Sequence, residues 1–162
     1  MYRVISCGVN GPSGAEPLQF AEKDAADVAA LFQSALGPRE LAGVALLQGA
    51  DATGANILSA LAEAVLEASD YLVFYFSGHG TDDGVAAADE LLPYDDLAEM
   101  IRYVDALHVF FILDVCSAGS AAGFLNTTVA CRAIATADDS AVGSTDILAA
   151  TARATARPRG GR

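Results

Sequence analysis

The chain is organised around the stretch Tyr71-Leu-Val-Phe-Tyr-Phe-Ser-Gly-His79-Gly80. A second stretch, Leu107-His-Val-Phe-Phe-Ile-Leu-Asp114-Val-Cys116-Ser-Ala-Gly119, has the same design, because in both an apolar run ends at a reactive side chain. Such runs, bounded by glycine or a polar residue, are typical of parallel strands covered on both faces. Ligands bind at the carboxyl edge of such a sheet. If the two strands are neighbours, His79 and Cys116 are expected to face each other across one cleft.

Apolar runs and helical periodicity alternate along the rest of the chain. Strands are expected at residues 4–9, 44–48, 71–76 and 109–115. Three helices are expected: one over residues 20–36, a second that Thr53 caps, and a third that Asp95 caps and that runs through Tyr103. Residues 85–93 are expected to form a loop or small hairpin at the cleft edge. This order predicts an α/β fold with three layers and a doubly wound, mostly parallel sheet.

The periodicity fades towards the carboxyl end. Residues 120–145 are expected to form a mobile linker, 146–151 a fifth strand, and 152–162, which include four arginines, a disordered tail. A chain of 162 residues with 53% hydrophobic residues can bury a core without disulfides or metal. We therefore expect one domain over residues 1–151.

The number of cysteines and the net charge indicate the compartment of the protein and the kind of partner it binds. Three cysteines are an odd number, and Cys7 and Cys116 occupy strand positions, so a reducing compartment is favoured over a disulfide framework. The amino terminus leads directly into a strand, and no run reaches the roughly 18 apolar residues that cross a bilayer. A soluble, cytoplasmic protein is expected. The net charge of −12 disfavours nucleic acid and anionic membranes and suits a cationic peptide, although solubility alone also explains it.

The two strand ends carry the elements of nucleophilic catalysis. A cysteine attacks as the thiolate, and an imidazole can take its proton near neutral pH. His79 ends its strand, whereas His108 begins one and is expected at the opposite edge of the sheet. The amides of Gly80 and Cys116 are candidate donors to the oxyanion that forms on an attacked carbonyl. This combination indicates acyl transfer, of which peptide hydrolysis is the commonest form.

Phe76-Ser-Gly-His79-Gly80 and Leu113-Asp114-Val-Cys116-Ser-Ala-Gly119 resemble the large-subunit core of the caspase-like cysteine peptidases, most closely the metacaspases and related bacterial proteins. The resemblance covers most of the chain. It implies the caspase-like fold and a catalytic dyad in which Cys116 attacks and His79 protonates the leaving amine. It also implies that Gly80 lends an amide to the oxyanion hole.

The same resemblance implies a preference for Arg or Lys at the cleaved position. Asp114 matches the acid that lines the family's pocket, and Asp24, within Ala21-Glu-Lys-Asp24-Ala25, is a candidate second wall. A carboxylate in a confined pocket pairs strongly with a guanidinium. The structural alternatives are a loop-capping carboxylate for Asp114 and a solvated helix residue for Asp24. Self-processing after Arg132 is a further expectation.

The chain departs from the family at two points. Cys116-Ser117-Ala118-Gly119 stands where metacaspases have Cys-His-Ser-Gly or Cys-Phe-Ser-Gly, and the carboxyl-terminal portion is shortened. An alternative function is therefore a catalytically incompetent interaction or regulatory module that needs a partner to complete its cleft. A flavodoxin-like domain is disfavoured, because Pro12 interrupts the loop where amides should contact phosphate.

The chemistry requires no cofactor. Some metacaspases need calcium, so a calcium requirement of this chain stays an open question. The candidate acids, Asp82, Asp83, Asp95 and Asp96, match no recognised loop spacing.

Overall fold

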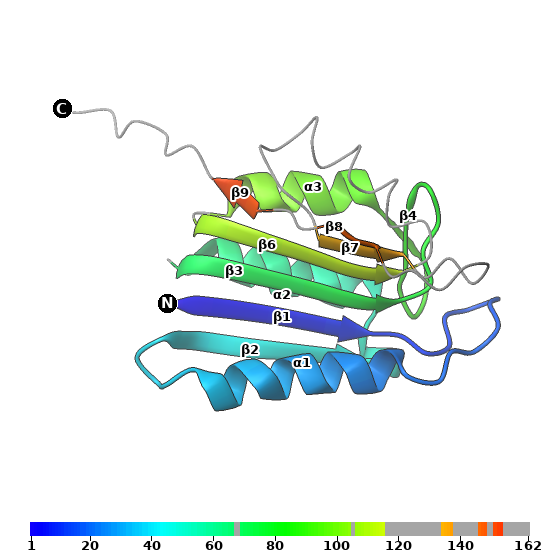
Figure 1. Cartoon of the computed structure of the whole chain (residues 1–162). Coiled ribbons are helices and arrows are strands. Elements are labelled where there is room, and N and C mark those ends of the chain that lie inside the picture. The colour runs from blue at the N-terminus through cyan, green and yellow to red at the C-terminus, as the bar shows by residue number, and fades with distance from the viewer. Residues whose placement is uncertain (67–68, 105, 116–133, 138–145, 149–150, 154–162) are drawn as a thin grey trace.

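The computed structural model describes residues 1–66, 69–104, 106–115, 134–137, 146–148 and 151–153 (Figure 1). Its helices are α1 (Ala21–Ala35), α2 (Gly54–Leu66) and α3 (Tyr94–Tyr103), with a short 3-10 turn at Gly49–Asp51. Its strands are β1 (Tyr2–Gly8), β2 (Leu41–Gln48), β3 (Ser69–Gly78), β4 (Gly84–Ala86), β5 (Leu91–Pro93), β6 (Ala106–Val115), β7 (Ile134–Ala137), β8 (Asp146–Leu148) and β9 (Thr151–Arg153).

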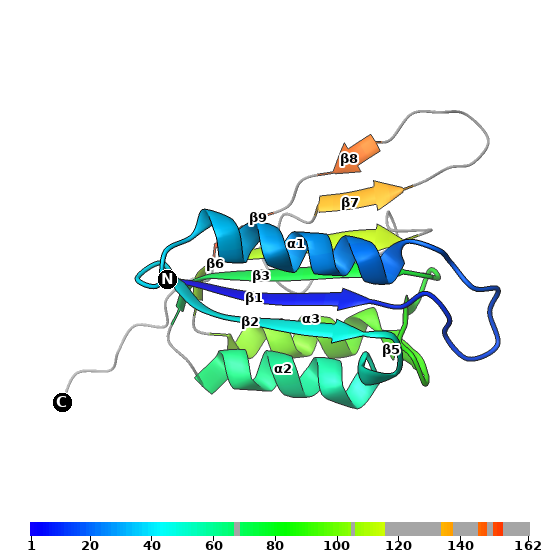
Figure 2. The ribbon, with the colours of Figure 1, turned by 90° about the horizontal axis from the view of Figure 1, so that it is seen from below.

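The central sheet has the strand order β2-β1-β3-β6-β7-β8, and β9 pairs with β6. Strands β2, β1, β3, β6 and β7 run parallel, while β8 and β9 are antiparallel to their partners. Helix α1 covers one face of the sheet, and α2 and α3 cover the other (Figure 2). The predicted three-layer α/β fold with a mostly parallel sheet is confirmed. The two strands that carry the motifs, β3 and β6, are neighbours in this sheet.

Side chains along β3 and β6 alternate between the two faces of the sheet. Phe74 and Phe76 of β3 join Phe111 and Leu113 of β6 in the core beneath α2 and α3. The rings of Phe74 and Phe111 stack with centroids 4.6 Å apart. Burying each such side chain contributes about 1.5–3 kcal/mol. Because successive residues point to opposite faces, Asp114 and the other alternate residues of these strands lie on the side of α1.

Helix α1 lies unusually close to β1. A Cβ atom at Gly8 would come within 2.7 Å of the Cα of Glu22, which is closer than two such carbon atoms approach. Two residues earlier, the buried Ser6 hydroxyl donates to the backbone carbonyl of Ala25 at 2.7 Å. These two contacts place the first turn of α1, with Asp24, over the carboxyl end of the sheet.

The structure confirms one of the two predicted helix caps. Thr53 caps α2 as expected, since its hydroxyl oxygen accepts from the amide of Asn56 at 3.1 Å. The prediction that Asp95 caps α3 is wrong. The N-cap is Pro93, in an extended conformation, and Tyr94 already begins the helix. Because the Tyr94 amide donates to the carbonyl of Asp83 at 3.0 Å, the loop satisfies an amide that a cap would otherwise serve.

The remaining segments differ in how far the structure describes them. The expected hairpin within 85–93 is confirmed as the antiparallel pair β4 and β5. Strand β7 lies inside the stretch 120–145, and β8 and β9 occupy parts of 146–153. The rest of the expected linker and tail lies outside the described residues, so the domain division stays a prediction. No described helix has the length and apolar character to cross a membrane.

We predict that Gly8→Ala lowers the free energy of unfolding by about 1–3 kcal/mol, because the added methyl group must push α1 away from β1. Urea denaturation followed by circular dichroism measures the loss. Gly11→Ala is the control, since a Cβ there meets no atom within 4 Å. Equal stability of the two variants would contradict the close packing of α1 on β1.

Candidate active site

His79 follows β3 directly and is held by contacts on both its side chain and its backbone. Its Nε2 atom lies 2.7 Å from the backbone carbonyl oxygen of Glu16. A carbonyl oxygen only accepts hydrogen bonds, so Nε2 carries the hydrogen and Nδ1 keeps the lone pair of the neutral ring. The His79 carbonyl accepts from the amide of Ala86 at 2.9 Å, which ties the residue to the β4–β5 hairpin.

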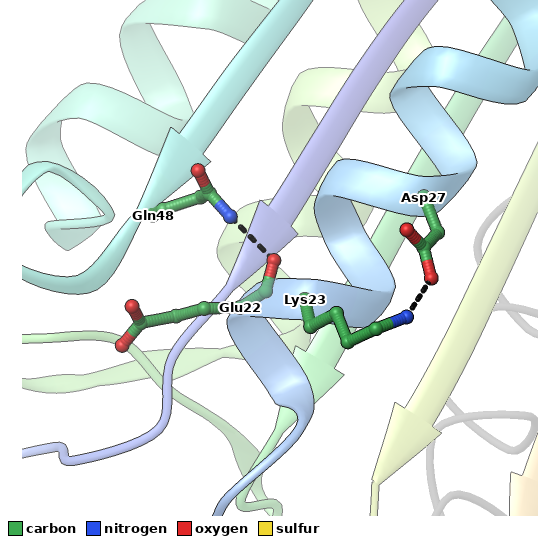
Figure 3. Close-up of polar contacts among 4 residues, drawn as sticks. All are labelled: Glu22, Lys23, Asp27 and Gln48. Atoms are coloured by element: carbon green, nitrogen blue, oxygen red, sulfur yellow. Dashed lines mark hydrogen bonds and ion pairs between the residues drawn. The ribbon is translucent and has the colours of Figure 1, made fainter.

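The loop that supplies the Glu16 carbonyl is fastened to α1. The Asn10 amide donates to the Glu22 carboxylate at 3.3 Å, and the Asn10 side-chain oxygen accepts from the Glu22 amide at the same distance. The Leu18 amide donates to the Asn10 carbonyl at 2.6 Å. The Gln48 side-chain amide donates to the Glu22 carbonyl, which connects α1 to the end of β2 (Figure 3). The contact with His79 therefore depends on the junction of β1, α1 and β2.

A cavity of about 240 Å³ lies beside this loop, over the carboxyl ends of β3 and β6. Both predicted pocket acids line it, Asp24 from α1 and Asp114 from β6, and each is half-buried. The other lining residues are Leu18, Gln19, Phe20, Ala21, Ser77, Gly78 and Val115. Ligand pockets for drug-sized molecules measure roughly 300–1,000 Å³. The smaller cavity suits one side chain of a larger ligand.

The sheet register explains why Ser77 and Asp114 meet in this cavity. They are partners across the parallel β3–β6 pair, and each lies two residues before the reactive residue of its motif. Gly78 and Val115, the residues directly before His79 and Cys116, are partners in the same register. Cys116 itself lies outside the described residues. Gly80 follows His79 and forms an isolated antiparallel bridge with Val85.

Tyr75, a buried residue of β3, has a raised pKa. Burial is the main cause that raises its pKa to about 12, and the charge of Asp114 adds to the effect. The Asp24 charge and a hydrogen bond to Asp114 raise this pKa further, whereas a hydrogen bond with Ser77 lowers it. Both carboxylates therefore act on the same buried hydroxyl. A cationic ligand would offset this concentration of negative charge.

Sequence reasoning missed three of these features. The Glu16 carbonyl has no sequence signal, because it is a backbone group placed by the loop. Tyr75 reads as one more apolar residue of its strand. Ser77 did carry a signal, since its distance from His79 equals that of Asp114 from Cys116.

The remaining reactive groups are the other cysteines and the acids considered for calcium. Cys7 is a free, buried cysteine whose pKa is raised by burial to about 12, which suits an inert thiol. Cys131 and Arg132 lie outside the described residues. Among the side chains that the structure describes, no three of His, Cys, Asp or Glu gather as metal ligands.

A family model of the caspase domain matches residues 4–156. The chain belongs to this family. The family is one of cysteine peptidases, which agrees with the resemblance of the two motifs. No curated protein matches the chain.

A crystal structure of a Geobacter sulfurreducens protein is similar, with a TM-score of 0.60 and 23% sequence identity. The match covers 82% of this chain and 57% of that one. At this identity the likeness concerns the fold, and the chain spans little more than half the length of that relative.

We predict that neutral His79 carries its proton on Nε2, because the Glu16 carbonyl accepts from that atom. Long-range nitrogen–proton NMR correlation of the histidine rings distinguishes the two tautomers. A His108→Gln variant assigns the signals, since His108 lies near the other end of the sheet, stacked on Tyr71. A neutral ring protonated on Nδ1 would contradict the contact with Glu16.

Proposed function

We propose that this caspase-domain protein is a cysteine endopeptidase that cleaves peptide bonds after Arg or Lys. The observation that carries the proposal is the cavity at the carboxyl edge of β3 and β6, where Asp24 and Asp114 line one small space. Gly78 lines the same cavity and is followed by His79. A side chain bound there would bring its own peptide bond close to the imidazole.

In the proposed reaction, Nδ1 of His79 takes the proton of the Cys116 thiol, and the thiolate attacks the carbonyl carbon of the peptide bond. The amides of Gly80 and Cys116 stabilise the oxyanion. The imidazolium then gives its proton to the leaving amine as the carbon–nitrogen bond breaks. Water attacks the resulting thioester, loses a proton to His79, and releases the acid product and the free thiol. The Glu16 carbonyl keeps the ring oriented throughout.

Two carboxylates favour a basic side chain at the cleaved position. A guanidinium offers several hydrogen-bond donors in one plane and pairs with carboxylates in bidentate fashion, and an ammonium offers three donors at one point. An acidic side chain would bring a third negative charge into the cavity beside Asp24 and Asp114. The net charge of −12 would also attract basic peptides over a distance and repel nucleic acid.

The alternative is an inactive interaction or regulatory module whose cleft a protein partner completes. It is supported by the stretch Cys116-Ser117-Ala118-Gly119, which departs from the sequence that metacaspases have around the nucleophile. We further propose a cytoplasmic location, on the ground of the odd number of cysteines, and a reaction that needs no metal. The two experiments below distinguish the enzyme from the module.

We predict that Asp114→Asn lowers kcat/KM for a fluorogenic Arg peptide at least tenfold, because the guanidinium loses its charged partner. Asp24→Asn should lower it in the same direction. Asp27→Asn is the matched control, since Asp27 is exposed on the same helix and pairs with Lys23 outside the cavity (Figure 3). A wild-type preference for Asp peptides would contradict the acidic pocket.

We predict that Cys116→Ala abolishes peptide cleavage, because the thiolate is the attacking group. The same variant should stay intact in mass spectrometry if the wild type cleaves itself after Arg132. Cys7→Ala is the control, since Cys7 is buried in the core and should not contribute. Cleavage that survives Cys116→Ala would contradict the nucleophile, and absence of cleavage in the wild type would favour the inactive module.

A further inference from the structure

The backbone amide of Gly80 points away from the β4–β5 hairpin. Gly80 and Val85 form an isolated antiparallel bridge, and the residues beside them make its two hydrogen bonds. One is the bond that the His79 carbonyl accepts from the hairpin, and the other runs from the Thr81 amide to the Gly84 carbonyl at 2.9 Å. Opposite residues flanked in this way do not bond to each other, and their amides point outward from the pair. The Gly80 amide is therefore not used by the ladder.

The turn that follows Gly80 is fixed to the buried start of α3. Residues 81–83 are exposed, whereas Tyr94, the first residue of α3, is only 1% exposed. The Tyr94 hydroxyl donates to the Thr81 carbonyl at 3.3 Å, and the Tyr94 amide donates to the Asp83 carbonyl at 3.0 Å. One buried residue therefore holds the exposed turn at two points, and the first of them directly follows Gly80.

Packing does not account for the Tyr94 hydroxyl. The ring lies in the apolar core with α2 and α3, where phenylalanine would fill nearly the same volume without burying a polar group. The hydroxyl contacts a backbone carbonyl of the turn instead of a side chain. Its distance of 3.3 Å is longer than the usual O–H···O distance of about 2.7–2.8 Å, so a modest contribution is expected.

We propose that Tyr94 is a positioning residue for the oxyanion hole, because it holds the Gly80 amide in place through the Thr81 carbonyl. The inference rests on the proposed function, in which Gly80 is one of the two oxyanion donors. Such a donor acts only when it lies within hydrogen-bond distance of the oxygen that becomes negative in the transition state. Tyr94 therefore serves the chemical step and not the binding of the basic side chain.

The first test compares cleavage of a fluorogenic Arg peptide by the wild type and by Tyr94→Phe. In the variant kcat should fall about three- to tenfold while KM stays nearly constant, because one hydrogen bond that holds the donor is lost. Loss of a whole oxyanion donor costs about 100- to 1,000-fold, so a smaller effect fits a residue that acts through another. Tyr71→Phe is the matched control, since it removes a hydroxyl from β3 near the other end of the sheet.

Two inhibitors separate the oxyanion hole from the acidic cavity. Benzamidine offers a cation to the cavity and no carbonyl to attack, so Tyr94→Phe should leave its affinity unchanged in isothermal titration calorimetry. A peptide aldehyde ending in argininal does use the hole. The Cys116 sulfur adds to its carbonyl carbon, the thiol proton passes to its oxygen, and that oxygen lies where the oxyanion forms. Tyr94→Phe should weaken this inhibitor by about the same factor as kcat.

Nuclear magnetic resonance of the unsubstituted protein gives a measurement that depends on no variant. Binding of the peptide aldehyde should shift the amide signal of Gly80 and the ring-carbon signal of Tyr94, while the ring signal of Tyr71 stays. A Tyr94 signal that stays while the Gly80 signal moves would contradict the coupling between the two residues.

The outcomes separate the inference from the function on which it rests. A wild type that cleaves the Arg peptide, with an unchanged kcat in Tyr94→Phe, would overturn the role of Tyr94 and leave the endopeptidase standing. Equal losses of benzamidine and aldehyde affinity in Tyr94→Phe would also overturn it, because they would indicate a general disturbance of the site. A wild type that cleaves no Arg peptide and binds neither inhibitor would overturn the proposed function together with the inference.

Discussion

The parallel pairing of β3 with β6 in a single register is the constraint on which the site depends. Side chains alternate between the faces of a strand, so a slip by one residue would turn Asp114 into the apolar layer beneath α2 and α3. The stacked rings of Phe74 and Phe111, together with the other buried residues of that layer, oppose such a slip. The apolar core therefore fixes the register, and the register brings Ser77 opposite Asp114.

The second wall of the cavity comes from a different part of the chain. Gly8 allows the first turn of α1 to approach β1 closely, and this brings Asp24 to the cavity that Asp114 lines. The loop before α1 is fastened through Asn10 and Glu22, and it carries the carbonyl that orients His79. One junction between a strand and a helix thus serves both the acidic pocket and the imidazole. A shift of α1 would disturb both at once.

The electrostatics of the cavity follow from this convergence. Two carboxylates, both half-buried, line one small cavity. Burial raises the pKa of the neighbouring Tyr75, and the negative charges of Asp114 and Asp24 add to this effect. A basic side chain in this cavity would pair with both carboxylates, and this supports the proposed preference for Arg or Lys. The chain has a net charge of −12, and these two carboxylates bring part of that charge into one cavity.

The sequence by itself determined the α/β class and the position of His79 at a strand end, and the family resemblance of its motifs pointed to Asp24 and Asp114 as pocket candidates. These follow from local patterns, because the apolar runs, the glycines and the motif spacing are written in consecutive residues. The start of α3 was predicted wrongly, since the Asp83 carbonyl and Pro93 replace the cap expected from Asp95.

Only the tertiary structure brought Asp24 and Asp114 to one cavity and aimed the Glu16 carbonyl at His79. Each of these contacts joins groups that are far apart in the chain or that belong to different strands. Sequence periodicity specifies which face of an element is apolar. It does not specify how closely two elements approach, and that distance decides which polar groups meet.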